Sequence, residues 1–123
     1  MEIIETKNAP QAIGPYSQAI IAGGMVYTSG QIAINPQSGN VEADTIEQQT
    51  EQVCKNVAEL LKASGSDISK VVKTTCFLRN MEDFAAFNAV YEKYFVSKPA
   101  RSCMAVRELP KNVLVEIDTV AEV

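Results

Sequence analysis

Three side chains near the C-terminal end of the sequence have the chemistry to act on a small acidic molecule. Arg101 is permanently charged and can hold a carboxylate through two parallel hydrogen bonds. Glu116 can activate a water molecule or pass on a proton, and Cys103 supplies a thiol. The chain has no histidine, which excludes a Ser-His-Asp triad and a histidine metal site. We therefore expect binding of a carboxylate-bearing molecule, with acid–base chemistry from the glutamate.

Each of these residues also has a purely structural interpretation. An arginine and a glutamate on neighbouring strands commonly form only an ion pair, worth about 0–1 kcal/mol when exposed. A lone cysteine such as Cys103 is often a small buried packing residue. Burial against a partly apolar surface would raise the pKa of Glu116, whereas a nearby arginine would lower it.

The pattern of the last part of the chain predicts how these side chains are placed. Residues 100–106 and 113–121 read as two strands joined by a turn, and side chains alternate across a strand. When the apolar faces of the two strands are matched, Arg101, Cys103 and Glu116 fall together on the opposite face. Cross-strand neighbours lie roughly 4.5–8 Å apart. We expect a hairpin that presents all three residues on one surface.

The rest of the chain predicts the elements that hold this hairpin. Gly23-Gly24 indicates a tight turn between two strands, and Asp44 with Glu47 forms a capping box for a helix that ends at Gly65. A second helix that ends before Pro99 is predicted by aromatic residues at helical spacing, which share one face: Phe84, Phe87, Tyr91 and Phe95. The further strands are expected at residues 2–6, 17–22, 25–32 and 69–78.

This order of elements, β-β-β-α-β-α-β-β, predicts an α+β fold with a mixed sheet and two helices on one face. The last strand carries apolar residues on both sides, for example Leu114 and Val120 against Val115 and Ile117. The face without helices then lacks a cover within the chain and is expected to pack on another subunit. We expect a homo-oligomer with sites at the subunit boundaries.

Composition sets the class of protein. The 123 residues are 46% hydrophobic and 21% charged, which suits a single domain spanning 1–123. A net charge of −4 and the lack of a basic stripe argue against nucleic acid and anionic membranes as partners. No apolar run is long enough to span a membrane. Cys54, Cys76 and Cys103 form no CxxC pair, which favours reduced thiols, no zinc site and a cytoplasmic location.

Several segments, in order along nearly the whole chain, resemble the Rid family of enamine/imine deaminases, and its RidA-like subgroup most closely. The clearest is Pro99-Ala100-Arg101-Ser102-Cys103-Met104-Ala105-Val106, followed by Leu109-Pro110-Lys111 and Val115-Glu116-Ile117. The others are Ile13-Gly14-Pro15-Tyr16-Ser17-Gln18-Ala19, Thr28-Ser29-Gly30-Gln31-Ile32, Val72-Lys73-Thr74-Thr75 and Phe87-Asn88-Ala89-Val90-Tyr91.

The resemblance implies a chorismate-mutase-like α+β fold, a homotrimer and ligand clefts between subunits. It also implies hydrolysis of 2-iminobutanoate and 2-iminopropanoate to 2-oxo acids and ammonia, without cofactor or metal. Such imines arise from pyridoxal-phosphate dehydratases, which implies a functional link to those enzymes and a role in metabolite damage control.

The resemblance also assigns roles to residues. By likeness, Arg101 holds the substrate carboxylate and Glu116 activates water. The remaining positions anchor the ligand or line the cleft: Ser29, Gly30, Tyr16, Asn88 and Cys103. Their structural interpretations are a turn or close-packing glycine, a half-buried aromatic ring and a core-facing asparagine with hydrogen-bond partners inside the protein.

Two other functions compete with the hydrolase. One is a non-catalytic module that binds or senses small 2-oxo or amino acids in the same cleft. The other is an RNA-directed or chaperone-like activity, against which the acidic balance of charge argues.

Overall fold

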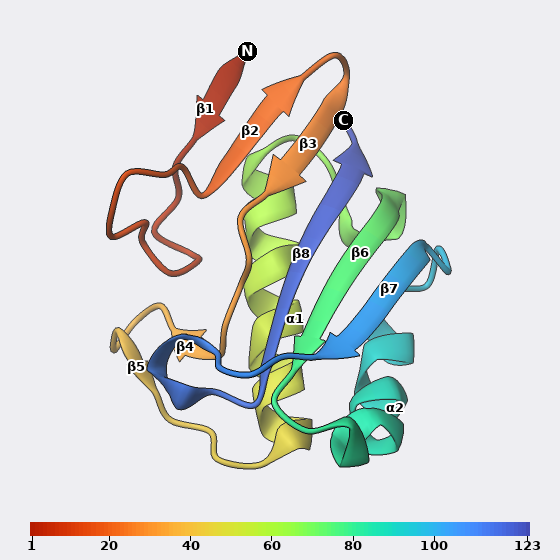
Figure 1. Cartoon of the computed structure of the whole chain (residues 1–123). Helices are drawn as coiled ribbons and strands as arrows, with labels where there is room; N and C mark the ends of the chain where they lie inside the picture. The colour runs from red at the N-terminus through yellow and green to blue at the C-terminus, as the bar shows by residue number, and fades with distance from the viewer.

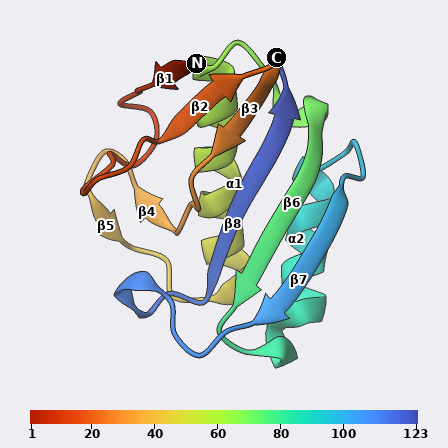
Figure 2. The same cartoon turned by 45° about the horizontal axis from the view of Figure 1, so that its top comes forward.

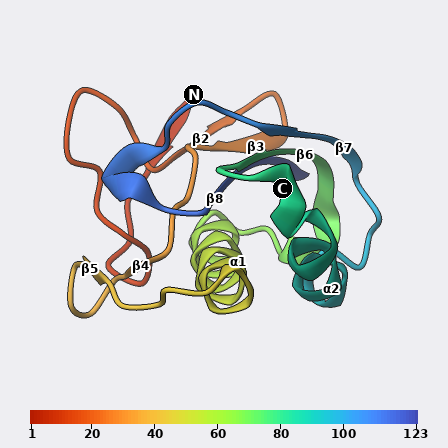
Figure 3. The same ribbon diagram turned by 60° about the horizontal axis from the view of Figure 1, so that its bottom comes forward.

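The computed structural model describes all 123 residues, which form a six-stranded mixed sheet with helices on one face (Figure 1). Across the sheet the strands are β1 (Glu2–Ile4), β2 (Ala19–Ala22), β3 (Met25–Thr28), β8 (Val115–Glu122), β6 (Val71–Leu78) and β7 (Ala100–Ala105). The long helices are α1 (Ile46–Ala63) and α2 (Phe84–Tyr94), and both lie on the same side of the sheet (Figure 3). The predicted fold class and the two helices on one face are confirmed.

Local sequence explains where α1 begins and ends. Its N-cap is Thr45, whose hydroxyl accepts a hydrogen bond from the backbone N–H of Gln48 at 3.2 Å. The cap is therefore one residue later than the predicted Asp44. The helix ends at Ala63, and Gly65 adopts a positive φ of 78°, a conformation that glycine takes without strain. The apolar stripe of α1, including Val53, supplies much of the core.

The aromatic face of α2 packs into the same core, as its spacing predicted. Phe87, Tyr91 and Phe95 are buried, and Phe84 is partly buried beside them. Tyr91 stacks on Phe95 with ring centroids 4.4 Å apart. This packing fixes α2 against the sheet next to its edge strand, β7.

The pairing of the last two strands differs from the predicted hairpin. β6 lies between β7 and β8, parallel to β7 and antiparallel to β8, so β7 and β8 are not neighbours (Figure 2). The reason is the crossover through α2: a strand, a helix and a following strand commonly give parallel neighbours with the helix on one face. The chain then passes over the end of β6 to reach the far side of that strand.

The face of the sheet opposite the helices has no helix over it (Figure 3). Tyr27 and Met104 are exposed there at 47% and 38%. Beyond the main sheet, residues 34–41 form a small two-stranded ribbon, β4 (Ile34–Asn35) with β5 (Asn40–Val41). No helix in the chain is both long enough and apolar enough to cross a membrane.

Candidate active site

Arg101 lies on the edge strand β7 and points toward α2. Its Nη1 donates to the side-chain oxygen of Asn88 at 2.7 Å. The guanidinium carbon lies 4.8 Å from the ring centre of Tyr91 and 5.4 Å from that of Phe84. These are cation–π distances, so the aromatic face of α2 holds the charge in place. The structure thus brings together Arg101 and Asn88, two of the predicted site residues.

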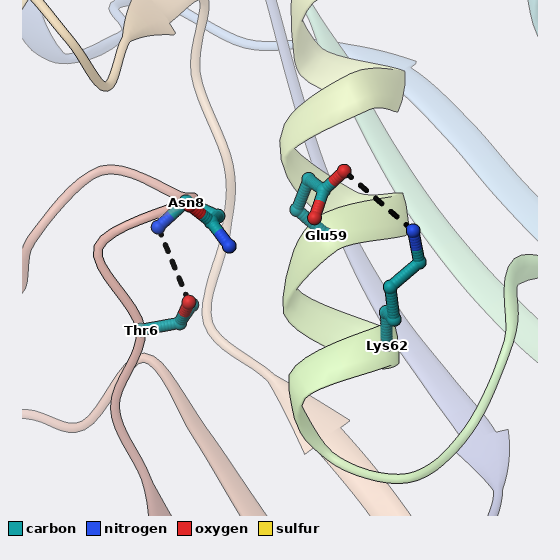
Figure 4. A network of polar contacts seen from close by, with 4 residues as sticks. All are labelled: Thr6, Asn8, Glu59 and Lys62. Carbon is teal, nitrogen blue, oxygen red and sulfur yellow. Dashed lines mark hydrogen bonds and ion pairs between the residues drawn. The ribbon is translucent and has the colours of Figure 1, made fainter.

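The guanidinium of Arg101 has no carboxylate partner within the chain. The one ion pair of the molecule joins Lys62 and Glu59 at 4.0 Å (Figure 4), and both residues lie on α1 and not on α2 or β7. Its hydrogen bond to Asn88 uses Nη1 and leaves Nε and Nη2 for another acceptor. A half-buried, oriented arginine with one free edge is suited to hold a carboxylate side-on.

Cys103 lies on β7 two residues from Arg101 and on the same face of the strand. Its ladder neighbour on β6 is the buried Cys76, so the thiol points toward the helices. Burial raises the pKa of Cys103, while the charge of Arg101 lowers it by a smaller amount. The net upward shift keeps a thiol at neutral pH, which suits a cleft wall better than a nucleophile.

Glu116 lies on β8 with its ladder neighbour Phe77, on the face without helices. Burial raises the pKa of Glu116, and the negative charge of Asp118 raises it further. A carboxylate with a raised pKa is a stronger base than an exposed one, which suits proton transfer to and from water.

Gly30 is packed directly against Glu116. A Cβ atom at position 30 would lie 2.1 Å from Glu116 Oε2, closer than any van der Waals contact allows. The backbone of residues 29–31 approaches β8 because Gln31 exchanges two backbone hydrogen bonds with Ile117. The absence of a side chain at position 30 is therefore what lets the carboxylate lie against this loop.

Tyr16 and Ser29 complete the surroundings of Glu116. The Ser29 hydroxyl donates to the carbonyl of Ser17 at 2.5 Å, which ties this strand end to the N-terminal loop. Asn8 N–H donates to the Thr6 hydroxyl in the same loop (Figure 4). Tyr16 and Ser29 border a recess of about 340 Å³ on this side of the molecule. The recess is also lined by Gly30, Glu116, Pro10 and Pro110.

The predicted site residues therefore form two clusters, not one. The arginine cluster is Arg101, Asn88 and Cys103; the glutamate cluster is Glu116, Gly30, Ser29 and Tyr16. The prediction that Arg101, Cys103 and Glu116 share a face is wrong, because Arg101 and Cys103 face the helices and Glu116 faces away. The predicted alternation of side chains within each strand is correct. The error is that β7 was paired directly with β8, whereas β6 lies between them.

Sequence reasoning missed the aromatic side chains that hold Arg101. Phe84, Phe87 and Tyr91 were expected only to share one face of the helix, yet each ring lies within 6.0 Å of the guanidinium carbon. Asn88 at the next position of the same helical face was the available signal. The chain gathers no group of three or more acidic, cysteine or histidine side chains that could hold a metal.

Comparisons with known proteins place the chain among related sequences and structures. A family described as endoribonuclease L-PSP matches residues 6–123. AldR of Lactococcus lactis, named as a candidate regulator, is 56% identical, over 100% of this chain and 98% of AldR. The 2-iminobutanoate/2-iminopropanoate deaminase of Escherichia coli is 46% identical, over 96% of this chain and 94% of its own length. The structure of E. coli TdcF with bound serine has a TM-score of 0.94 at 41% identity, over 100% of this chain and 99% of TdcF.

Proposed function

The chain belongs to the endoribonuclease L-PSP family, which includes the Rid proteins that its sequence resembles, and we propose that it hydrolyses small 2-imino acids to 2-oxo acids and ammonia. The observation that carries this proposal is Arg101, an oriented guanidinium that no carboxylate of its own chain neutralises. The deaminase relative, similar over nearly its whole length, supports the reaction class.

The chemistry requires few groups. Arg101 holds the carboxylate of the imino acid and so fixes the adjacent imine carbon. Glu116 takes a proton from water as the oxygen bonds to that carbon, and passes this proton to the imine nitrogen, which gives a carbinolamine. Glu116 then carries the hydroxyl proton of the carbinolamine to the amine nitrogen, and the C–N bond breaks to release ammonia and leave the 2-oxo acid. Free imines hydrolyse unaided, so acid–base help of about 10²–10⁴-fold suffices.

The two clusters can serve one reaction only if they meet. Within one chain they lie on opposite faces of the sheet with β6 between them. We propose that the arginine cluster of one subunit faces the glutamate cluster of the next in a homotrimer. The face without helices, with Tyr27 and Met104 exposed on it, supplies apolar surface for such packing.

The decisive experiment is an imine assay. A pyridoxal-phosphate dehydratase generates 2-iminobutanoate in situ, and release of 2-oxobutanoate is followed with and without this protein. We expect the wild type to accelerate release, and Arg101→Ala and Glu116→Gln to lose the acceleration. Arg107→Ala, which removes an exposed arginine outside both clusters, serves as the matched control. Equal rates with and without the wild type at high protein concentration would refute the proposal.

A second candidate function is binding or sensing of small amino or 2-oxo acids in the same cleft. The relative AldR is named as a candidate regulator, and TdcF was solved with serine bound. This alternative predicts calorimetric binding of 2-oxobutanoate that needs Arg101, no acceleration of imine hydrolysis, and binding retained in Glu116→Gln.

The family description also names an endoribonuclease. A net charge of −4 disfavours contact with a phosphate backbone. RNA cleavage by pure protein that survives Arg101→Ala would assign that activity to another site or to a contaminant.

A further inference from the structure

Tyr91 is the closest aromatic neighbour of the Arg101 guanidinium, and it is held from behind by a buried hydrogen bond. The guanidinium carbon lies 4.8 Å from its ring centre. The Tyr91 hydroxyl lies 2.7 Å from the Thr74 hydroxyl, and Thr74 is completely buried on β6. Burial raises the pKa of Tyr91, so this phenol stays protonated at neutral pH and the bond persists.

Thr74 is well placed to fix this ring relative to Arg101. It is the ladder neighbour of Arg101, because the parallel register pairs Thr74 with Arg101. The hydrogen bond therefore ties α2 to the interior strand β6 at the position where β7 carries the arginine. The thiol of Cys76 also approaches the Thr74 hydroxyl, at 3.8 Å, which leaves that hydroxyl surrounded by partners.

The other hold on Arg101 comes from Asn88, one turn before Tyr91 on the same helix. Asn88 fixes one nitrogen of the guanidinium, and the Tyr91 ring fixes its distance from the helix. Two restraints from one helix define an orientation only if the helix itself cannot shift along the sheet. The bond between Tyr91 and Thr74 links α2 to β6, whereas the bond from Arg101 to Asn88 reaches only the edge strand β7.

We propose that Tyr91 and Thr74 are positioning residues, which hold the guanidinium of Arg101 in the orientation that presents its free Nε and Nη2 edge to the substrate carboxylate. This inference rests on the proposed function and deepens it. Neither residue touches the substrate. A guanidinium that is already oriented loses less entropy on binding, so the contribution appears as affinity for the carboxylate.

Two conservative substitutions test the proposal. Tyr91→Phe keeps the ring and removes the hydroxyl, and Thr74→Val keeps the shape and removes its partner. Each is expected to raise KM for 2-iminobutanoate by about threefold to tenfold, the effect of one hydrogen bond, with kcat nearly unchanged. The double variant should equal the singles and not their product, because both remove the same bond.

Tyr94→Phe is the matched control. Tyr94 lies on the same helix, and its hydroxyl donates to Glu51, so the variant removes a comparable hydrogen bond between helices. Tyr94 makes no contact with Arg101 within hydrogen-bond or cation–π distance. This variant should show a similar change in melting temperature and an unchanged KM.

Mobility of the guanidinium gives a readout that needs no turnover. The chain has three arginines, so their Nε–H signals can be resolved by NMR and assigned with single substitutions. We expect restricted rotation of the Arg101 guanidinium in the wild type and faster rotation in Tyr91→Phe and Thr74→Val. Tyr94→Phe should match the wild type. Calorimetric binding of 2-oxobutanoate should weaken in parallel with the KM effect.

These readouts separate the two proposals. Unchanged Arg101 dynamics and unchanged 2-oxobutanoate affinity in both variants would overturn the positioning role, whatever the catalytic result. A wild type that binds 2-oxobutanoate but does not hydrolyse imine would overturn the proposed function. In that case the NMR and binding measurements would still decide whether Tyr91 and Thr74 orient Arg101.

Discussion

The arginine cluster and the glutamate cluster are built by opposite means. Arg101 is held by added contacts: three aromatic rings, the amide of Asn88 and the packed interface between α2 and the sheet. Glu116 instead depends on free space, because its carboxylate occupies the position that a side chain at Gly30 would fill. The arginine cluster is half-buried and packs against the core, whereas the glutamate cluster is bordered by loops. Orientation of a permanent charge benefits from rigid packing, whereas a base that exchanges protons needs burial and access to water.

The largest expected effect tests whether the two clusters work together across subunits. Arg101→Ala and Glu116→Gln should each be inactive alone. When the two variants are refolded together in equal amounts, the mixture should regain about a quarter of wild-type activity. A shared site takes its arginine from one subunit and its glutamate from the next. Both residues are present in about a quarter of randomly assembled sites.

The control for this measurement is a mixture of Arg101→Ala with the double variant Arg101→Ala/Glu116→Gln, which can form no intact site. Rescue in the first mixture alone supports the shared site. Absence of rescue in verified mixed oligomers would contradict it and return each cluster to a separate role.

Gly30→Ala should have the next largest effect. A Cβ at this position would meet Oε2 of Glu116 at 2.1 Å, so the carboxylate must turn away from the loop. The atom displaced is the far end of a flexible side chain, so the melting temperature should fall by only a few degrees. Turnover should fall by more than about tenfold, because misplaced groups forfeit acid–base help.

The expected pattern separates this position from other glycines. Gly39→Ala meets nothing within 4 Å and should affect stability through its positive φ but leave turnover unchanged. A Gly30→Ala variant with wild-type turnover would show that Glu116 does not act from the position seen here.

The two clusters also differ in how far the sequence could predict them. Asn88 and Arg101 were both identified as site residues, and the helical spacing of Phe84, Phe87 and Tyr91 placed them on one face. The contact itself required knowing that β7 lies beside β6. Local signals were sufficient elsewhere: Gly23-Gly24 predicted the turn between β2 and β3, and β-branched residues predicted β6.

Strand order is not a local property, and this is where the sequence interpretation went wrong. Within β7 and β8 the alternation of faces was correct, as the burial of Val115 and Ile117 shows. Pairing the two strands directly ignored β6, which relates them through Thr74 to Arg101 on one face and Phe77 to Glu116 on the other. One unrecognised neighbour was enough to move Glu116 to the opposite side of the sheet from Arg101.

A smaller effect is expected from Asp118→Asn. Burial is the main cause of the raised pKa of Glu116, and Asp118 is the second. Activity requires the ionised base, so it falls as the pH drops through this pKa. Removing the neighbouring charge should move the acid side of the pH–rate profile to lower pH by less than about one unit. Glu122→Gln, at the exposed end of the same strand, should leave the profile in place, and a shift to higher pH in Asp118→Asn would contradict the assignment of Glu116 as the base.

The smallest effect concerns stability and has opposite signs in the two clusters. The pKa of Glu116 in the folded state is raised above its ordinary value of 4.5, so folding favours the neutral form. The stability from this preference is present below about pH 4.5 and is lost as the pH rises through the folded pKa. Glu116→Gln, which is neutral at every pH, should therefore melt a few degrees higher than the wild type at pH 7, and the difference should vanish near pH 4.

Arg101→Ala should melt lower at both pH values, because it removes packing and a hydrogen bond whose partner carries no charge. Calorimetry at equal protein concentration measures both, and a Glu116→Gln variant less stable than the wild type at pH 7 would mean that the carboxylate is held by a partner that the single chain does not contain.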